Sequence, residues 1–348
     1  MKWNAFKYLL PVLIYVGSWV SFHRTGFWVW LPLIYGFVLI PLVELFLKPD
    51  DKNLDVAEEA IAKKDWRYDL FLYLIVPLQY LALFVFLQIM QQPDMPVVDR
   101  VGHILVMGLL CGTFGINVAH ELGHRVNRTE QFLAKSLLLT SLYMHFIIAH
   151  NRGHHKFVST PHDPASARFG EPLYLFWIRS ITGVYAESWG IANAEMKKKD
   201  LPAFHWKNEM LRFQLIQITF CILIVYFFGI AVFAYFLGAA IMGILLLETV
   251  NYIEHYGLSR KPTGEGKYER AMPHHSWNSN HVIGRLMLFE LSRHSDHHYQ
   301  ANRKYQLLRH HDKSPQLPTG YPGSMLLAAI PPLWFRVMNS KIAALSIQ

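Results

Sequence analysis

Histidine carries the most informative pattern in this sequence, because nine of the 19 histidines fall into four short clusters. The clusters read HELGH at 120–124, HNRGHH at 150–155, NYIEHYGL at 251–258 and RHSDHH at 293–298. Neutral imidazole is a frequent ligand of transition metals, so the clustering predicts a metal site. The candidate ligands are His120, His124, His150, His154, His155, His255, His294, His297 and His298.

HELGH alone has the HExxH pattern of a zinc peptidase, with two histidine ligands and a glutamate base. The spacing of four places His120 and His124 on one helix face, and the same spacing relates His150 to His154. Nine imidazoles exceed the four ligands of tetrahedral zinc, so we expect two metal ions with four or five imidazoles each. Fe, Cu, Ni and Zn all accept nitrogen ligands. A redox metal is favoured because the clusters offer no obvious bridging carboxylate.

Carboxylates near the clusters are expected to hydrogen-bond to the imidazoles and to offset the charge of the metal ions. Glu248 lies near the inner end of an apolar stretch, where an ionisable side chain indicates function. Asp163, in TPHDP, is equally well explained by a turn or a helix cap. The predicted residues of this kind are Glu121, Glu254, Asp296, Glu248, Asp163 and Asn251, with Asn117 as a further hydrogen-bonding candidate.

The other histidines are predicted to lie outside the ligand set. Hydrogen-bonding or structural roles are expected for those in PHHSWNSNH, which are His274, His275 and His281. A solvated loop is expected for His310 and His311. Packing or surface positions are expected for His23, His103, His145, His162 and His205.

Long apolar stretches must position these clusters, since 52% of the 348 residues are hydrophobic. Seven stretches are candidates for membrane spans, which need about 20 residues each. If the stretch 131–149 crossed the membrane, it would separate His150 from His120 by roughly 30 Å, too far for a shared site. We therefore predict that it lies along the membrane face, which leaves six spans, near 6–22, 27–47, 69–91, 101–121, 211–229 and 232–251.

The predicted fold is an all-α integral membrane protein with one membrane-embedded catalytic domain over residues 1–348. Lys and Arg are frequent between Lys48 and Asp69, so the positive-inside rule places this loop in the cytoplasm. The end of the fourth span, at His120, then lies on the cytoplasmic side too. A cytoplasmic cap of helices and loops, residues 122–210 and 256–348, is expected to hold the dimetal site.

Composition excludes several other classes. Cys111 and Cys221 lie far apart in apolar stretches, so the chain has no CxxC pair and no cysteine set for an iron–sulfur cluster. A net charge of +8 suits loops that face anionic lipid or an acidic partner, and no nucleic-acid signature is present. The N-terminal stretch lacks an A-x-A cleavage site and is interpreted as a first span.

The four clusters, together with PHHSWNSNH and LPTGYPG, resemble those of the membrane-bound alkane monooxygenases. That family belongs to the histidine-rich diiron membrane desaturases and hydroxylases. The resemblance implies two Fe ions on the nine histidines, O2 as cosubstrate, and hydroxylation of the terminal carbon of medium-chain alkanes to primary alcohols. It also implies electrons from a separate rubredoxin, with its reductase, an alkane that enters from the lipid bilayer, and a site on the cytoplasmic side of a bacterial inner membrane.

Three positions depart from the family's usual pattern. Ala149 precedes the second cluster where the family usually has Glu, Arg125 follows HELGH where Lys is frequent, and Tyr299 follows RHSDHH where Ala is frequent. The loss of the Glu removes an acceptor that would orient an imidazole. Basic residues of the expected cap are candidates for guiding an acidic electron donor, namely Arg125, Arg128, Arg152 and Lys156.

Three alternatives remain open at this point. A related membrane diiron enzyme would act on a fatty acyl chain, a sterol or an aromatic methyl group. An intramembrane zinc peptidase would use HELGH, with Glu121 as its base. A metal-binding or transport protein without turnover would place ionisable residues deep in several spans, and the predicted spans are largely free of them.

Overall fold

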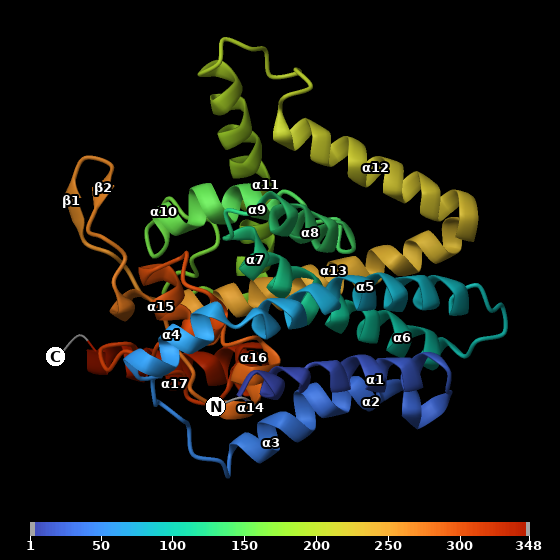
Figure 1. The fold of residues 1–348 in the computed structure, drawn as a ribbon, viewed down its shortest axis with the longest axis horizontal. Helices are drawn as coiled ribbons and strands as arrows, with labels where there is room; N and C mark the ends of the chain where they lie inside the picture. Colours follow the sequence, from blue (N-terminus) through green and yellow to red (C-terminus); the bar gives the residue numbers. More distant parts are fainter. Residues whose placement is uncertain (1–3, 346–348) are drawn as a thin grey trace.

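The computed structural model describes residues 4–345, and it confirms the predicted all-α membrane fold (Figure 1). In the described part of the chain, six helical segments are long and apolar enough to cross a membrane. Each lies within a few residues of a predicted span. The six segments are Ala5–Phe22, Gly26–Glu44, Trp66–Ile89, Val97–Gly123, Glu209–Phe228 and Ile230–His255.

The first two segments form a helical hairpin. The chain turns at Gly26, whose φ of +64° favours glycine. The Gly26 amide donates to both carboxylate oxygens of Asp99 at 3.1 Å, which fixes the turn against the fourth span. The arms consist of η1 (Asn4–Leu9) and α1 (Val12–Phe22), then η2 (Gly26–Trp30), α2 (Leu31–Ile34), the π-helical η3 (Tyr35–Leu39) and α3 (Ile40–Glu44).

The fourth span changes helix type along its length. It begins as α6 (Val97–Leu110), widens into the π-helical segment η4 (Cys111–Ile116) and ends as α7 (Asn117–Gly123). A π segment rotates the residues that follow it relative to an uninterrupted α-helix. The direction in which His120 and His124 point therefore depends on η4.

Small residues allow the fourth span to approach α13 (Ile230–His255) closely. A Cβ at Gly112 would lie 2.9 Å from the carbonyl oxygen of Gly243, and a Cβ at Gly243 would lie 2.6 Å from the Cβ of Cys111. Close backbone approach at small residues is the usual way in which membrane helices associate. This contact joins the helix that carries HELGH to the helix that ends at His255.

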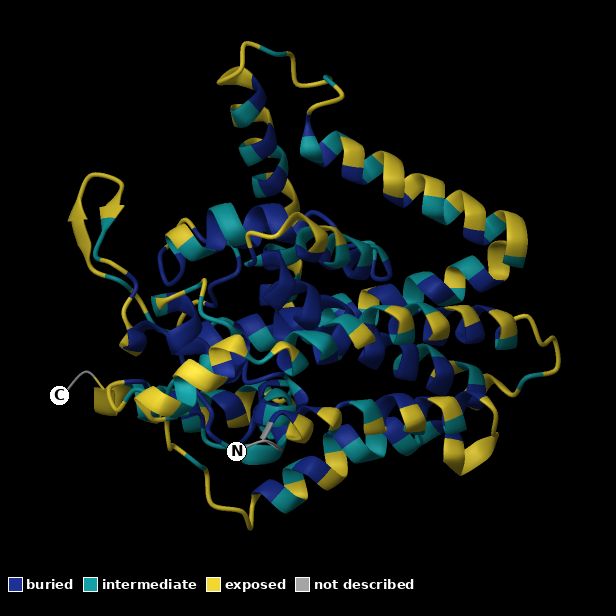
Figure 2. Cartoon of the chain, in the orientation of Figure 1, coloured by how far each residue is buried: buried dark blue, intermediate teal, exposed yellow. Residues whose placement is uncertain are grey.

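The two other long spans complete the membrane bundle. They are α5 (Trp66–Ile89) and α12 (Glu209–Phe228), and α12 is tilted away from the body of the molecule (Figure 1). Much of α12 is exposed (Figure 2), including the apolar side chains of Leu215, Ile218 and Ile222. An exposed apolar face of this size fits contact with lipid.

The stretch 131–149 does not form a span, as predicted. It divides into α8 (Arg128–Leu139) and α9 (Phe146–Ala149). Between them the chain turns sharply, with a positive φ of 52° at Leu142. Because of this turn, the second histidine cluster begins close to the end of HELGH.

Most of the elements outside the spans fall in residues 122–210 and 256–348, for which a cap was predicted, and α11 projects toward the loop before α12 (Figure 1). Residues 1–3 and 346–348 of the predicted single domain lie outside the described residues. The remaining elements are α4 (Val56–Lys64), α10 (His155–Phe157), α11 (Leu173–Lys197), the antiparallel β1 (Pro262–Gly264) and β2 (Lys267–Tyr268), η6 (Pro273–His275), α14 (Val282–Met287), α15 (His294–Tyr299), η7 (Tyr305–Leu307), α16 (Tyr321–Ala328) and α17 (Pro331–Leu345).

The close contact between η4 and α13 predicts a sensitive position. Gly243→Ala places a methyl group 2.6 Å from the Cys111 Cβ, and overpacking of this kind costs about 1–3 kcal/mol. We expect a lower midpoint of thermal unfolding for the detergent-solubilised protein. Gly190→Ala is the control, since a Cβ there has no atom within 4 Å. Equal midpoints for the two variants would refute the packing argument.

Candidate metal centre

HELGH lies at the end of the fourth span, directly after the π-helical segment η4. His120 is in α7 and His124 follows the last residue of α7. The Nε2 atom of His120 lies 2.9 Å from that of His297, and the Nε2 atom of His124 lies 3.1 Å from that of His150. The first cluster therefore meets the second and the fourth, which lie far from it in the sequence.

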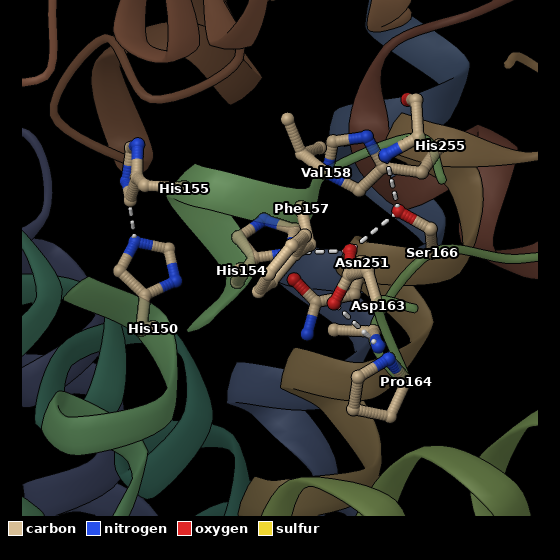
Figure 3. A network of polar contacts seen from close by, with 12 residues as sticks. His150, His154, His155, Phe157, Val158, Asp163, Pro164, Ser166, Asn251 and His255 are labelled. Carbon is tan, nitrogen blue, oxygen red and sulfur yellow. Dashed lines mark hydrogen bonds and ion pairs between the residues drawn. The ribbon is translucent and has the colours of Figure 1, made fainter. Parts of the chain in front are cut away.

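The second cluster adopts a conformation that its spacing did not reveal. HNRGH is not an α-helical turn but the π-helical segment η5 (His150–His154). The wider turn brings His150 and His155 together, with their Nε2 atoms 3.0 Å apart. His154 points to the other side, toward Asp163 (Figure 3). The pairing of His150 with His154 on one face, which the spacing of four predicted, is therefore wrong.

The fourth cluster also divides its histidines between two sides. His294 and His298, one turn apart in α15, have their Nε2 atoms 2.8 Å apart. His297 points to the opposite side, and its Nε2 lies 3.1 Å from that of His155. His255, the last residue of α13, contacts the Nε2 of His294 at 3.2 Å.

All nine predicted ligands thus form two adjoining groups. The nitrogen atoms within each group lie within 4.8 Å of one another. We call them the five-histidine group, which is His120, His124, His150, His155 and His297, and the four-histidine group, which is His154, His255, His294 and His298.

Hydrogen bonds among the rings do not explain this convergence. In the five-histidine group, the Nε2 atoms of His124, His150 and His155 lie 3.0–3.2 Å from one another in a triangle. Each Nε2 carries either a proton or a lone pair. At least two corners of the triangle must therefore be alike and repel each other. A cation shared by the lone pairs removes this conflict.

The spacing of the nitrogen atoms also bears on the coordination geometry. With metal–nitrogen bonds of about 2.1 Å, neighbouring ligands are about 3.0 Å apart at right angles and about 3.4 Å apart in a tetrahedron. The Nε2 contacts within the two groups are 2.8–3.2 Å. These are the shortest contacts, and the other nitrogen atoms of each group lie within 4.8 Å of one another, so each group offers enough donors for one metal ion.

Burial keeps the imidazoles in the form that binds metal. It is the main cause that lowers the pKa of His150, His155 and His297 well below the ordinary value, with neighbouring histidines adding to the effect. The pKa of His124 falls to about 3 for the same main reason. Neutral rings have lone pairs that are free for a metal.

His154 is the exception among these rings because it lies beside the Asp163 carboxylate. Burial acts to lower the pKa of His154, but the Asp163 carboxylate outweighs it and the pKa is raised. The Nδ1 atom of His154 lies 2.8 Å from Asp163 Oδ2, and the Ser166 hydroxyl donates to the same oxygen at 2.5 Å. Asp163 therefore holds the His154 ring so that Nε2 faces the four-histidine group.

Glu254 is the second predicted carboxylate that touches an imidazole. Its Oε1 lies 3.2 Å from the Nδ1 of His294 and accepts a hydrogen bond from the Tyr321 hydroxyl at 2.7 Å. The approach to His294 is close but poorly aligned, since this Nδ1 makes no hydrogen bond to any described residue. The sequence did not single out Tyr321.

The other predicted residues lie one side chain further from the rings. Glu121 forms a salt bridge with Arg125 at 2.5 Å and accepts from the Tyr305 amide at 3.1 Å. Glu248 accepts from the Tyr143 and Ser180 hydroxyls and from the Asn251 amide. These partners occupy the Glu121 carboxylate, which argues against its use as a peptidase base.

Asp296 belongs to RHSDHH, but its carboxylate faces away from the imidazoles of that cluster. It accepts from Arg303, from the Arg309 amide and from His311, whose Nε2 lies 2.7 Å from Oδ1. His311 lies in a loop and is partly exposed, as expected, and its contact with Asp296 is one that the sequence did not predict. Asp296 joins the loop after α15 to this cluster and so fixes where α15 lies.

The position of Ala149 borders a small cavity. His150, His154, Glu187 and Glu248 also line it. Glu187 comes from α11 and packs directly over Gly153, a contact that the sequence did not predict. Burial, and then the nearby Asp163, raise the pKa of Glu187 to about 7. A carboxyl group therefore lies beside the second cluster although Ala149 has none.

Two of the four basic residues expected to guide a partner are engaged within the chain. Arg125 pairs with Glu121 and with Asp69, and Arg152 pairs with Glu195 and Glu209. Arg128 and Lys156 are exposed. The four residues do not form one free basic surface.

The fold and the site define a histidine-rich integral membrane metalloprotein. The profile of the family described as fatty acid desaturase matches residues 101–324. The chain is 40% identical to alkane 1-monooxygenase 2 of Pseudomonas aeruginosa over 99% of its own length and 92% of that protein. It is 38% identical to the alkane 1-monooxygenase of Pseudomonas putida, covering 95% of this chain and 83% of that one.

A more distant relative is the hydroxylase component of xylene/toluene monooxygenase from Pseudomonas putida, which is 27% identical over 95% of this chain and 86% of that protein. The chain belongs to the fatty acid desaturase family and, within it, to the alkane 1-monooxygenases.

Asp163→Asn tests the orienting contact to His154. The amide keeps the size of the side chain but loses the charge that holds the His154 ring. Loss of such a partner typically weakens metal binding about 10–100-fold, so we expect this loss for one of two bound ions. Competition with a chelator measures it. Asp312→Asn is the control, since Asp312 is fully exposed and lies away from both groups. Unchanged affinity in Asp163→Asn would refute the role of Asp163.

Proposed function

We propose that this chain is an alkane 1-monooxygenase that hydroxylates the terminal carbon of medium-chain alkanes at a diiron centre. The observation that carries the proposal is the convergence of nine histidines into two adjoining groups beside an apolar pocket. The five-histidine and four-histidine groups would each hold one Fe ion. An unpolarised C–H bond resists acid–base and nucleophilic attack, and a metal centre that activates O2 supplies the oxidising power needed.

The apolar pocket fits an alkane substrate. It lies between the first, second, fourth and sixth spans, and its lining is apolar except for a few side chains such as Thr113, Asn117 and Tyr321. Asn117 is one turn before His120 in α7, so the same helix carries one end of the pocket and a ligand of the five-histidine group. Leu109, which precedes Asn117 by roughly 12 Å along the fourth span, still lines the pocket.

The chain's own residues would exclude water and place the terminal carbon near the metal groups. The pocket walls are mainly apolar side chains, so an alkane in the pocket contacts residues such as Leu109, Leu246 and Met287. Asn117 donates to the Leu288 carbonyl at 3.1 Å and thereby fixes α7 against the segment before α15. This contact fixes the position of α7, which carries both Asn117 at the end of the pocket and His120.

Electrons would come from a separate rubredoxin with its reductase. The sequence has only two cysteines, and both are in the membrane spans, so the chain cannot hold the four-cysteine iron site of such a donor. The cap would receive the donor on the cytoplasmic side of the bacterial inner membrane. Arg128 and Lys156 are exposed candidates for this contact.

The contacts of the positively charged loop support the cytoplasmic placement. The loop includes Lys48, Lys52, Lys63 and Lys64, and the positive-inside rule assigns such a loop to the cytoplasm. Arg293, which opens the fourth histidine cluster, donates to the Lys52 carbonyl at 2.8 Å. The loop and the metal groups therefore lie on the same side of the spans.

The first experiment measures metal content and product formation by the purified chain. We expect about two Fe ions per chain and 1-octanol from octane when O2, rubredoxin and its reductase are supplied. His155→Ala and His255→Ala should each lower the iron content, because they remove a ligand from different groups. One zinc ion per chain, or product from p-xylene but none from octane, would contradict the proposal.

Gly36→Phe tests whether the pocket holds the alkane chain. Gly36 lines the pocket and has no atom within 4 Å of a Cβ position, so the new ring would fill space that a long alkane needs. We expect the ratio of kcat/KM for dodecane to that for octane to fall about 10-fold or more. Gly190→Phe, at an open position outside the pocket, should leave the ratio unchanged. An unchanged ratio in Gly36→Phe would exclude this pocket as the substrate site.

A further inference from the structure

Tyr321 connects the apolar pocket to one of the two histidine groups. It is the first residue of α16, and its buried ring lines the pocket. Its hydroxyl points away from the apolar lining and donates to Glu254 Oε1 at 2.7 Å. The same oxygen lies 3.2 Å from the Nδ1 of His294, whose Nε2 belongs to the four-histidine group. One side chain thus separates the pocket from a carboxylate that touches a metal-facing imidazole.

We propose that Tyr321 is a positioning residue through which an alkane in the pocket alters the environment of the metal ion at the four-histidine group. The inference rests on the proposed function and adds a residue and a direction of coupling to it. The path runs from the Tyr321 ring to its hydroxyl, then to Glu254 and to His294.

The contact between Glu254 and His294 is one that a small change can improve. The distance of 3.2 Å is within reach of a hydrogen bond, but the His294 Nδ1 is fully buried and makes none to a described residue. A slight rotation of the carboxylate or the ring would align the two. A carboxylate that accepts from a ligating histidine increases the basicity of that histidine toward its metal. The alignment of Glu254 would therefore affect the metal ion directly.

An alkane supplies a physical reason for such a change. An alkane in the pocket packs against the face of Tyr321 and excludes solvent from it, which keeps the local dielectric constant low. Hydrogen bonds to a carboxylate strengthen in such surroundings. Burial, and then Glu254, already raise the pKa of Tyr321 well above its ordinary value, so the hydroxyl remains a donor. A stronger bond from Tyr321 would hold Glu254 in one orientation toward His294.

A second tyrosine–glutamate pair provides a matched comparison. The buried Tyr143 hydroxyl donates to Glu248 Oε1 at 2.9 Å, in nearly the same geometry as the first pair. Tyr143 does not line the apolar pocket. Glu248 bonds to Ser180 and Asn251, and no contact with an imidazole is found among the described residues. Loss of the Tyr143 hydroxyl should therefore leave the effect of an alkane intact.

The experiment compares Mössbauer spectra of iron-loaded protein with and without octane, in the absence of electron donor. In the unchanged chain, we expect octane to shift the quadrupole splitting of one of two iron sites. Tyr321→Phe, which keeps the ring and the pocket wall, should abolish this shift and weaken the binding of one ion about 10-fold in chelator competition. Tyr143→Phe should retain the shift.

The outcomes separate this inference from the proposed function. A shift in Tyr321→Phe equal to that of the unchanged chain, or no shift in an unchanged chain that binds two Fe ions and hydroxylates octane, would overturn the coupling alone. Failure of the unchanged chain to bind iron or form 1-octanol would overturn the proposed function. If Tyr321→Phe does not fold, Glu254→Gln provides the same test, because it keeps an acceptor for Tyr321 and removes the charge that faces His294. Loss of the shift in that variant would support the coupling, and its persistence would overturn it.

Discussion

The structure depends on holding nine imidazoles whose Nε2 atoms converge in two adjoining groups. Converging lone pairs are unfavourable unless cations lie between them, so the surrounding helices must hold the rings in place. Three sets of contacts hold the rings in place. They are the glycine contact between η4 and α13, the salt bridges of Asp296 and Glu121, and the contact between Asp163 and His154.

The helix geometry at the clusters also determines the direction in which the imidazoles point. The π-helical segment η5 places His150 and His155 on one side and His154 on the other, so the six consecutive residues His150–His155 contribute to both histidine groups. The segment η4, upstream of HELGH, sets the direction of His120 and His124. The π-helical segment η3 contributes Gly36 and Phe37 to the lining of the pocket. π-Helical segments are rare and concentrate at functional sites, and here they lie at the histidines and at the pocket.

The pocket and the metal groups form one unit because the same elements build both. α7 provides Asn117 to the pocket and His120 to the five-histidine group, within one turn. α13 provides Leu246 and Leu247 to the pocket and Glu254 and His255 near the four-histidine group. A substrate held between these helices therefore lies against the segments that orient the ligands.

The sequence by itself determined the six spans, the nine histidines and the non-crossing stretch 131–149. Hydropathy and the number of residues needed to cross a bilayer are local properties, and a shared site sets a limit on distance. Only the tertiary structure decided how the nine histidines divide into five and four, because the π-helical turn at His150–His154 is not encoded in residue spacing. It also placed Glu187 and Tyr321 near the groups, since their contacts join segments that lie far apart in the chain.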